Sequence, residues 1–324
     1  MDTTVCIKPP LAENILFVEG ISRSGKFLVS NLLAGISEVE PVQYLWLLEQ
    51  IPVLNSRGLI EDETAKEIAR CELDLHCYEL LIGRNLNHRK SDKSSIFNYP
   101  DVDLYLERCN HIDGDAPIQK FWKEQRFAQF ILHESMHHIE FYLSAFHKAK
   151  IISIVRSPAD LAYSWYKRGL GCRWGKDPKL FQITFSYKTV PVPWFIYPLA
   201  EDYLSLSEVD RAIFSIIRLH RLAVEKYRSL SLSLQRRILI TSFEHLMRNP
   251  LPEITRIGEF LQKEISVTIH QILSHEQLPN LSHLEEKERR LRELKAVANP
   301  KLYQELLQLD HLYFQGKLYP LNFN

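Results

Sequence analysis

The segment GISRSGKF, residues 20–27, follows the apolar run of residues 15–19 and precedes a run with helical spacing of apolar residues. It matches the G-x-x-x-x-G-K pattern of a phosphate-binding loop, in which Gly20, Gly25 and Lys26 occupy the fixed positions. A strand that leads through such a turn into a helix aims backbone N–H groups and the positive end of the helix dipole at one point. The order strand, loop, helix therefore predicts an anion-binding corner. An ordinary tight turn between strand and helix is the alternative.

One position of this loop departs from the P-loops that hydrolyse nucleotides. Those loops carry Ser or Thr after the Lys, whose hydroxyl holds magnesium, whereas this chain has Phe27. The second support of the metal would be an Asp that ends a later apolar strand. The apolar runs 150–155 and 237–241 are instead followed by Arg156 and Ser242. The sequence therefore predicts a loop that binds its anion without a metal.

Short apolar runs alternate with longer amphipathic ones along the chain. The runs that we expect to contain strands are residues 15–20, 127–135, 150–158 and 236–246. The third and fourth are short and rich in β-branched residues, which favours strands buried on both faces. Strands that alternate with helices predict an α/β protein with a central parallel sheet flanked by helices.

The organisation expected from these patterns is one domain that spans residues 1–324. Residues 41–109 read as a mainly helical insertion and residues 263–324 as a helical C-terminal segment. Residues 170–206 are rich in Pro and aromatic residues, unlike a regular core element. We expect this stretch to form a loop-rich cover over the carboxyl edge of the sheet, where ligands of open α/β sheets bind.

The composition limits the class of protein. The chain has 324 residues, 45% of them hydrophobic, so it can bury a full core. Its 40 Lys and Arg residues balance 40 Asp and Glu residues, which argues against general binding of nucleic acids or anionic membranes. Its five cysteines lack the paired spacing of zinc sites, which favours reduced thiols. With no apolar stretch of membrane-spanning length, we expect a soluble, cytoplasmic protein without a transmembrane segment.

Two motifs together resemble the sulfotransferases that use 3′-phosphoadenosine 5′-phosphosulfate (PAPS). The family carries a G-x-x-[RK]-S-G loop, which residues 20–25 match, and an R-x-P-x-D-x-x-x-S strand-to-helix motif, which Arg156 to Ser164 match. The segment SFEHL, residues 242–246, is similar to a Tyr-Glu-Asp-Leu-like tetrad late in the family. The resemblance implies the P-loop-like sulfotransferase fold, PAPS as the co-substrate and no metal.

The resemblance also implies which residues hold the donor. Arg156 and Ser164 would bind its 3′-phosphate, and the cations Arg23 and Lys26 would stabilise the negative charge that develops on the leaving group. The full implied donor set is Ser22, Arg23, Ser24, Gly25, Lys26, Phe27, Arg156 and Ser164. The chain has Lys-Phe where the family usually has Thr-Thr and lacks the Gly-rich C-terminal clasp of the cytosolic branch, so it looks closer to bacterial or carbohydrate-directed branches.

A base must take the proton of the acceptor, and the family places one shortly before the second motif. FILHESMHH, residues 130–138, offers Glu134, which we favour, and then His137 and His133. Because side chains alternate along a strand, Glu134 and His133 are expected on opposite sides. Glu134 as a helix cap and the histidines as hydrogen-bonded boundary residues are the alternatives. A metal site is disfavoured: residues 133–137 match the letters H-E-x-x-H, but the spacing of His133 and His137 suits a metal only on a helix, and this run is expected to be extended.

Three further segments carry aromatic or charged residues that need a place. The helix of the second motif carries Trp165, Tyr166 and Arg168. We expect these side chains mainly to fill the core of the protein, with stacking on a ligand as the alternative. Arg173, Trp174 and Lys176 lie in a loop punctuated by Gly, which favours ligand contacts. Residues 281–297 have helical periodicity and a charged face, which indicates a solvated surface helix.

The sequence therefore favours sulfuryl transfer from PAPS to a hydroxyl or amine of a small-molecule, lipid or carbohydrate acceptor. A P-loop kinase that depends on magnesium is one alternative. A non-catalytic protein that binds adenosine bisphosphate or a protein partner on the same fold is the other.

Overall fold

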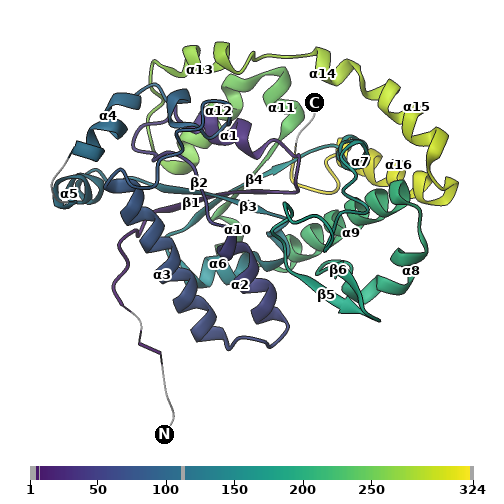
Figure 1. Cartoon of the computed structure of the whole chain (residues 1–324). Helices are drawn as coiled ribbons and strands as arrows, with labels where there is room; N and C mark the ends of the chain where they lie inside the picture. The colour runs from purple at the N-terminus through teal and green to yellow at the C-terminus, as the bar shows by residue number, and fades with distance from the viewer. Residues whose placement is uncertain (1–4, 7, 111–113, 322–324) are drawn as a thin grey trace, which may run out of the picture.

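The computed structural model describes residues 5–6, 8–110 and 114–321. Its centre is a five-stranded sheet with the strand order β2-β3-β1-β4-β7, in which every neighbouring pair is parallel (Figure 1). The strands are β1 (Ile15–Gly20), β2 (Gln43–Tyr44), β3 (Ala128–His133), β4 (Lys150–Val155) and β7 (Ile238–Ser242). The predicted α/β class with a central parallel sheet is confirmed.

Helices cover both faces of this sheet (Figure 1). One face packs against α1 (Lys26–Leu33), α11 (Phe243–Arg248), α12 (Pro250–Leu261) and α13 (Ile269–His275). The other packs against α2 (Trp46–Ser56), α3 (Asp62–Leu81), α5 (Asp115–Lys123), α6 (Ile139–Ala145), α7 (Pro158–Lys167), α9 (Glu208–Ser229) and α16 (Pro300–Phe314). The remaining helices are α4 (Val102–Glu107), α8 (Ala200–Ser205), α10 (Leu232–Gln235), α14 (Ser282–Glu285) and α15 (Lys287–Val297). Single 3₁₀ turns are η1 (Ile96–Asn98), η2 (Arg108–Asn110), η3 (Met136–His138) and η4 (Tyr197–Leu199).

The central strand β1 shows why the sheet is covered twice. Ile15 and Phe17 belong to the core on one face, and Leu16 and Val18 belong to the core on the other. All four side chains are buried. A strand with apolar residues at successive positions has no face for water, so it needs helices on both sides.

Two segments contain strands where the sequence patterns indicated helices or loops. Residues 43–44, expected in a helix, form the edge strand β2, and the following helix begins only at Trp46. The cover of residues 170–206 contains the antiparallel hairpin β5 (Thr184–Tyr187) and β6 (Val190–Pro193). Two-residue strands and hairpins with several prolines carry too short a periodic signal for recognition.

The carboxyl edge of the sheet brings three loops together. Gly20 at the end of β1 lies in register with His133 at the end of β3, and Glu19 lies in register with Ser153 of β4. The loops that follow β1, β3 and β4 therefore begin side by side, which is where open α/β sheets bind ligands. Among the described residues, no helix combines the length and apolar composition that crossing a membrane requires.

Candidate active site

The loop after β1 is a tight turn that places two residues in the left-handed region. Arg23 has φ 78° and Gly25 has φ 108°. A Cβ at Gly25 would lie 2.7 Å from the ring of Phe243, so the turn requires glycine there for its backbone and for its packing. The N–H of Ser24 donates to the carbonyl of Ile21 at 2.9 Å, and α1 begins at Lys26. This geometry agrees with the predicted strand-loop-helix corner.

Lys26 points into the protein and holds this loop from within. Its side chain is buried, and its ammonium donates to the carbonyls of Gly20 and Ile21 at 2.7 and 3.1 Å. Burial lowers the pKa of Lys26, whereas nearby Glu134, Glu19 and Glu49 oppose that shift, as nearby negative charge must. The sequence led us to expect Lys26 to face the leaving group. In the structure its ammonium instead donates to the carbonyls of the loop.

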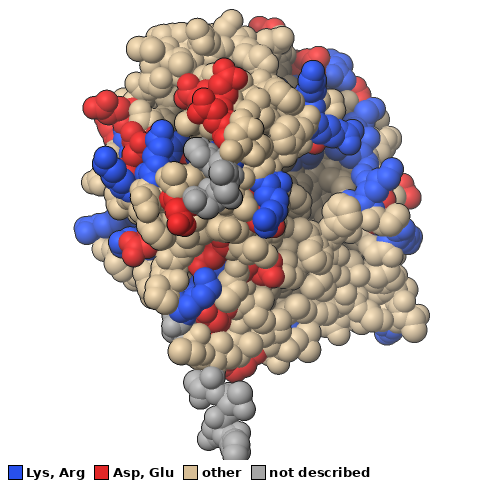
Figure 2. Space-filling model, turned by 60° about the vertical axis from the view of Figure 1, so that its left-hand side comes forward, with Lys and Arg blue, Asp and Glu red and all other residues tan. Residues whose placement is uncertain are grey.

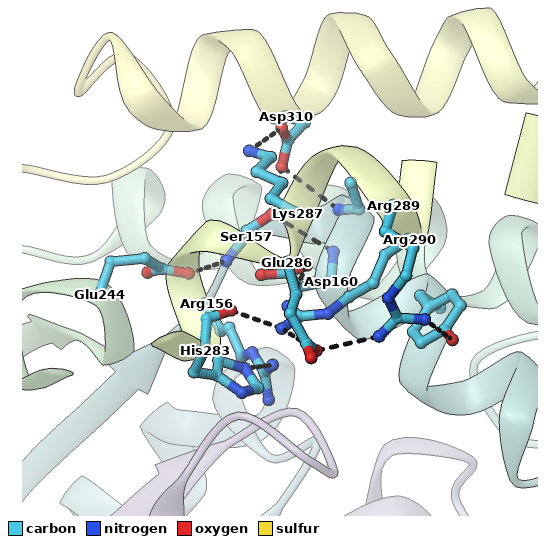
Figure 3. Close-up of polar contacts among 12 residues, drawn as sticks. Arg156, Ser157, Asp160, Glu244, His283, Glu286, Lys287, Arg289, Arg290 and Asp310 are labelled. Atoms are coloured by element: carbon cyan, nitrogen blue, oxygen red, sulfur yellow. Dashed lines mark hydrogen bonds and ion pairs between the residues drawn. The ribbon is translucent and has the colours of Figure 1, made fainter. Parts of the chain in front are cut away.

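Arg156 joins the two motifs directly. It follows β4, and its Nη1 donates to the backbone carbonyl of Arg23 at 2.8 Å. Its guanidinium lies over the ring of Phe243, with 4.3 Å from Cζ to the ring centroid. Its Nη2 lies 2.5 Å from Nε2 of His283 (Figure 3). The first loop and the second motif are therefore in direct contact at the carboxyl edge of the sheet.

Arg23 lies near two other arginines, whose charges disfavour its own. Burial lowers the pKa of Arg23, although much of the residue is exposed, and the nearby Arg168 and Arg156 lower it further. The Nε of Arg156 is buried and has no hydrogen-bond partner within the described ranges. Ser164 lies half-buried on α7, two turns after Arg156. Clustered guanidiniums with an unused buried donor suit an anion such as phosphate.

The strand-to-helix corner at Arg156 is fixed by the C-terminal segment. The hydroxyl of Ser157 caps α7 and donates to Asp310 of α16 at 2.5 Å, and its backbone N–H donates to Glu244 at 2.9 Å (Figure 3). Lys287 of α15 pairs with the same Asp310 at 2.6 Å. These contacts hold the start of α7 beneath the arginines.

The segment of residues 281–297 is more than the solvated surface helix expected from its charges. Arg290 and Leu294 of α15 are buried, and Arg290 pairs with Asp160 of α7 at 2.8 Å (Figure 3). His283 of α14 contacts Arg156, and burial, followed by Arg156 and Arg290, lowers the pKa of His283 to about 4. Sequence reasoning missed His283, because four-residue α14 carries no motif.

Glu134, just beyond the end of β3, holds the first loop, which follows the neighbouring strand β1. Its Oε1 accepts the backbone N–H of Ser22 at 2.5 Å, and its Oε2 accepts from the amide of Gln182 at 3.4 Å. The residue is buried and has φ 51° just beyond the end of β3. A carboxylate in this position orders the loop that carries Arg23.

His133, the last residue of β3, pairs with a buried carboxylate on α2. The Nδ1 of His133 lies 2.7 Å from Oε1 of Glu49, which also accepts the backbone N–H of His133 at 2.8 Å. Burial lowers the pKa of His133 to about 3 and raises the pKa of Glu49 to about 8, because each charged form loses water. The imidazole is therefore neutral, with Nε2 as its remaining nitrogen. No sequence signal identified Glu49, which lies 84 residues earlier on a helix.

A cavity of about 290 Å³ opens in front of these groups. Its lining includes Ser22 and Phe27 of the first loop and both His133 and Glu134. The expectation that His133 and Glu134 face opposite sides is wrong, because the strand ends at His133 and the left-handed backbone of Glu134 turns its side chain back. Trp174 also lines the cavity, as its loop position suggested.

The remaining candidates lie outside this cavity. His137 stacks on Trp194 with ring centroids 5.7 Å apart, and burial lowers its pKa. Ser24 is buried beneath the loop, and its Oγ has no partner within the described residues.

The aromatic and charged residues of the second-motif helix and the following loop also lie elsewhere, apart from Trp174. Trp165 is fully buried and donates to the carbonyl of Ser22 at 2.9 Å, which fits the expected core role. Arg173 pairs with Asp177 at 2.6 Å. Tyr166 packs against the core, and Arg168 and Lys176 are exposed.

Charges of both signs are spread over the surface, in keeping with the balanced composition. Figure 2 shows Lys and Arg side chains gathered at the upper right of this face, beside a recess, and further Lys and Arg side chains interspersed with Asp and Glu on its left.

The chain was compared with curated proteins, with solved structures and with protein-family models. A search of curated proteins gave no significant match. Similar solved structures include the sulfotransferase domain of the Synechococcus PCC 7002 olefin synthase (17% identity, 96% of each chain, TM-score 0.46). The sulfotransferase domain of the curacin biosynthetic pathway matches 80% of this chain and 77% of that one (12% identity, TM-score 0.44). The family model described as a sulfotransferase domain matches residues 66–300, more than half of the chain, so this chain belongs to the sulfotransferase family.

Proposed function

We propose that the chain transfers the sulfuryl group of PAPS to a hydroxyl group that enters the cavity in front of His133. Membership of the sulfotransferase family supports sulfuryl transfer in general. The contact between Arg156 and the carbonyl of Arg23 is the observation that carries the choice of donor. It makes one continuous cationic surface from two motifs that lie 133 residues apart in the chain.

The donor would lie along this surface. Arg156, with its unpartnered Nε, and Ser164 would hold the 3′-phosphate, and Arg23 and the backbone of the first loop would hold the 5′-side. In the transfer, the acceptor oxygen bonds to sulfur as the bond from sulfur to the bridging oxygen breaks. The bridging oxygen keeps the electron pair and leaves with adenosine 3′,5′-bisphosphate (PAP). Arg23 stabilises this negative charge, and a preorganised donor of this kind contributes about 3 to 4 kcal/mol.

We assign the base to His133 in preference to Glu134. Nδ1 of His133 is held by Glu49, which leaves Nε2 to accept the proton of the hydroxyl. Glu49 then stabilises the imidazolium that forms. Glu134 lines the same cavity, but its Oε1 is engaged by the backbone N–H of Ser22. Glu49 is a positioning residue, and Glu134 positions the loop.

Calorimetric titration with PAP and with ADP, each with and without magnesium, tests this assignment. We expect PAP to bind at least tenfold more tightly than ADP and to be indifferent to magnesium, because cations from side chains hold both phosphates. Tight binding of ADP only in the presence of magnesium would contradict the assignment and favour the P-loop kinase alternative.

A further inference from the structure

The wall of the cavity in front of His133 is mostly aromatic and apolar. Phe27, Tyr44, Trp46, Leu180 and Phe181 all line it. These side chains come from the start of α1, from β2 and the start of α2, and from residues 180–181, so three separate segments turn apolar surface toward one space. A wall of this kind recognises an apolar body by excluding water from it.

The charges in this wall disfavour an anionic acceptor. Glu49 and Glu134 both line the cavity and are buried, whereas Lys179 is its single cation among the lining residues. Phe27 donates no hydrogen bond where the family usually offers a hydroxyl. An acceptor that brought its own carboxylate or sulfate would meet like charge at Glu134, and at Glu49 once that carboxyl ionises above about pH 8, and would gain no pairing there.

Two of the lining residues each have a buried polar atom without a partner. The indole N–H of Trp174 and the amide carbonyl oxygen of Gln182 are both buried, and neither makes a hydrogen bond within the described residues. The amide nitrogen of Gln182 is committed to Glu134. A buried donor or acceptor without a partner costs about 1 to 3 kcal/mol, and a ligand that offers the missing partner recovers that free energy.

We propose that the acceptor is a small neutral alcohol with an apolar body and a second neutral polar group, such as another hydroxyl, that pairs with Trp174 and Gln182. The identification of the cavity as the acceptor site rests on the proposed function. The reacting hydroxyl gives its proton to Nε2 of His133, and its oxygen bonds to sulfur as the bridging oxygen leaves with PAP. A volume of about 290 Å³ lies at the lower end for ligand sites, so only a small body enters fully.

Part of a longer acceptor would rest on the mouth of the cavity. Phe181 is 62% exposed and Tyr44 is 45% exposed, and both line the same cavity. Exposed aromatic residues beside a pocket extend its apolar surface toward solvent. The rim therefore favours acceptors whose uncharged end projects outward.

Two naphthols that differ by a carboxylate, together with a neutral sugar, test the preference for an uncharged, apolar acceptor. Transfer from PAPS is measured with 2-naphthol, 6-hydroxy-2-naphthoate and methyl glucoside, and binding of each acceptor to the PAP-loaded protein is measured by calorimetry. We expect 2-naphthol to be preferred over both others by at least tenfold in kcat/KM and in affinity. Equal or better use of the naphthoate or the glucoside would overturn the acceptor class, as would failure of 2-naphthol to bind.

A substitution at the rim should reverse this preference. Phe181→Lys places a cation at an exposed position of the cavity wall, so the folded state should be kept. We expect the ratio of kcat/KM for 6-hydroxy-2-naphthoate to that for 2-naphthol to rise at least fivefold. Leu232→Lys, at a 73% exposed position on α10 outside the cavity, is the control that should leave the ratio unchanged. The same rise in both variants would contradict a local effect.

Trp174→Phe tests the second polar group. The variant keeps one aromatic ring near Trp165 and Phe195 but removes the indole N–H together with the rest of the five-membered ring, so 2-naphthol serves as the control for the lost packing. We expect KM for 2,6-dihydroxynaphthalene to rise at least threefold while KM for 2-naphthol and both kcat values stay near the wild type. Equal changes for the two acceptors would show that Trp174 acts only by packing.

The titration with PAP distinguishes failure of the acceptor proposal from failure of the proposed function. If PAP binds and a charged or sugar acceptor is sulfated, the donor assignment stands and the acceptor proposal fails. If PAP does not bind and no acceptor is sulfated, the proposed function itself fails.

Discussion

The guanidinium of Arg156 donates a hydrogen bond to the backbone carbonyl of Arg23 at 2.8 Å. This bond ties the corner after β4 to the corner after β1, which are adjacent strands of the sheet. It also fixes Arg23 with φ 78°, a conformation that non-glycine residues seldom adopt. The bond therefore holds the two corners at a fixed separation, which reduces the reorganisation that binding of an anion between them requires.

His133→Ala should lower kcat strongly and leave the affinity for PAP unchanged. A positioned base contributes on the order of a hundred- to ten-thousandfold, so we expect a fall in that range in steady-state assays. His137→Ala is the matched control, because His137 stacks on Trp194 and lies outside the cavity. A fall of similar size in His137→Ala, or none in His133→Ala, would contradict the assignment of the base.

The pair of Glu49 and His133 should give the reaction a distinct pH dependence. Burial raises the pKa of Glu49 to about 8, so below that pH the pair holds the extra proton that must leave before Nε2 can act as a base. We expect kcat/KM to rise with pH and to level off above about 8. The assay uses an aliphatic alcohol, whose own hydroxyl does not ionise in this range.

Glu49→Gln isolates this effect, because the amide does not titrate. The rise through about pH 8 should disappear in the variant, and kcat should be lower over the whole range. An unchanged pH profile would show that Glu49 has a structural role only.

Lys26→Met should destabilise the fold and weaken the loop. The substitution leaves the carbonyls of Gly20 and Ile21 without their buried donor and removes the cation near Glu134 and Glu19. Loss of one partner from a buried charge network costs about 3 to 5 kcal/mol, which urea unfolding measures as a change in the free energy of unfolding. Lys295→Met, at an exposed position on α15, is the control. Loss of PAP affinity at full stability would instead place Lys26 among the ligand contacts.

Arg290→Ala should uncouple the C-terminal segment from α7. The buried pair of Arg290 and Asp160 at 2.8 Å would be broken, and we expect about 3 to 5 kcal/mol of destabilisation by the same measurement. Arg292→Ala removes the same charge from a 72% exposed position on α15 and should change stability by less than about 0.5 kcal/mol. Equal effects of the two variants would argue against a structural role for this segment.

The strands and the two motifs could be predicted because their signals are local. The run 15–20 became β1 with the expected bounds, and the run 150–158 contains β4, which ends at Val155, since each is a short apolar run followed by a turn signal. The cap by Ser157 with Pro158 at the start of α7 also follows from adjacent residues. Strands and helix caps of this kind can be predicted from neighbouring residues, without knowledge of the tertiary structure.

The partners of the site residues could not be predicted, because they come from distant segments. Glu49 reaches His133 from a helix packed beside β3, and His283 reaches Arg156 from a four-residue helix. The orientation of Glu134 depended on where β3 ends, and a shift of one residue reverses the face of a side chain. The direction of Lys26 depended on which buried carbonyls lacked donors.

The contribution of Arg156 to recognition of the 3′-phosphate tests the central claim most directly. Calorimetric affinities for PAP and for adenosine 5′-monophosphate are compared in the wild type, in Arg156→Ala and in the charge-matched control Arg292→Ala. The wild type and the control should bind PAP at least tenfold more tightly than the monophosphate, and Arg156→Ala, still folded by circular dichroism, should bind the two alike. A preference for PAP that survives in folded Arg156→Ala would contradict the account.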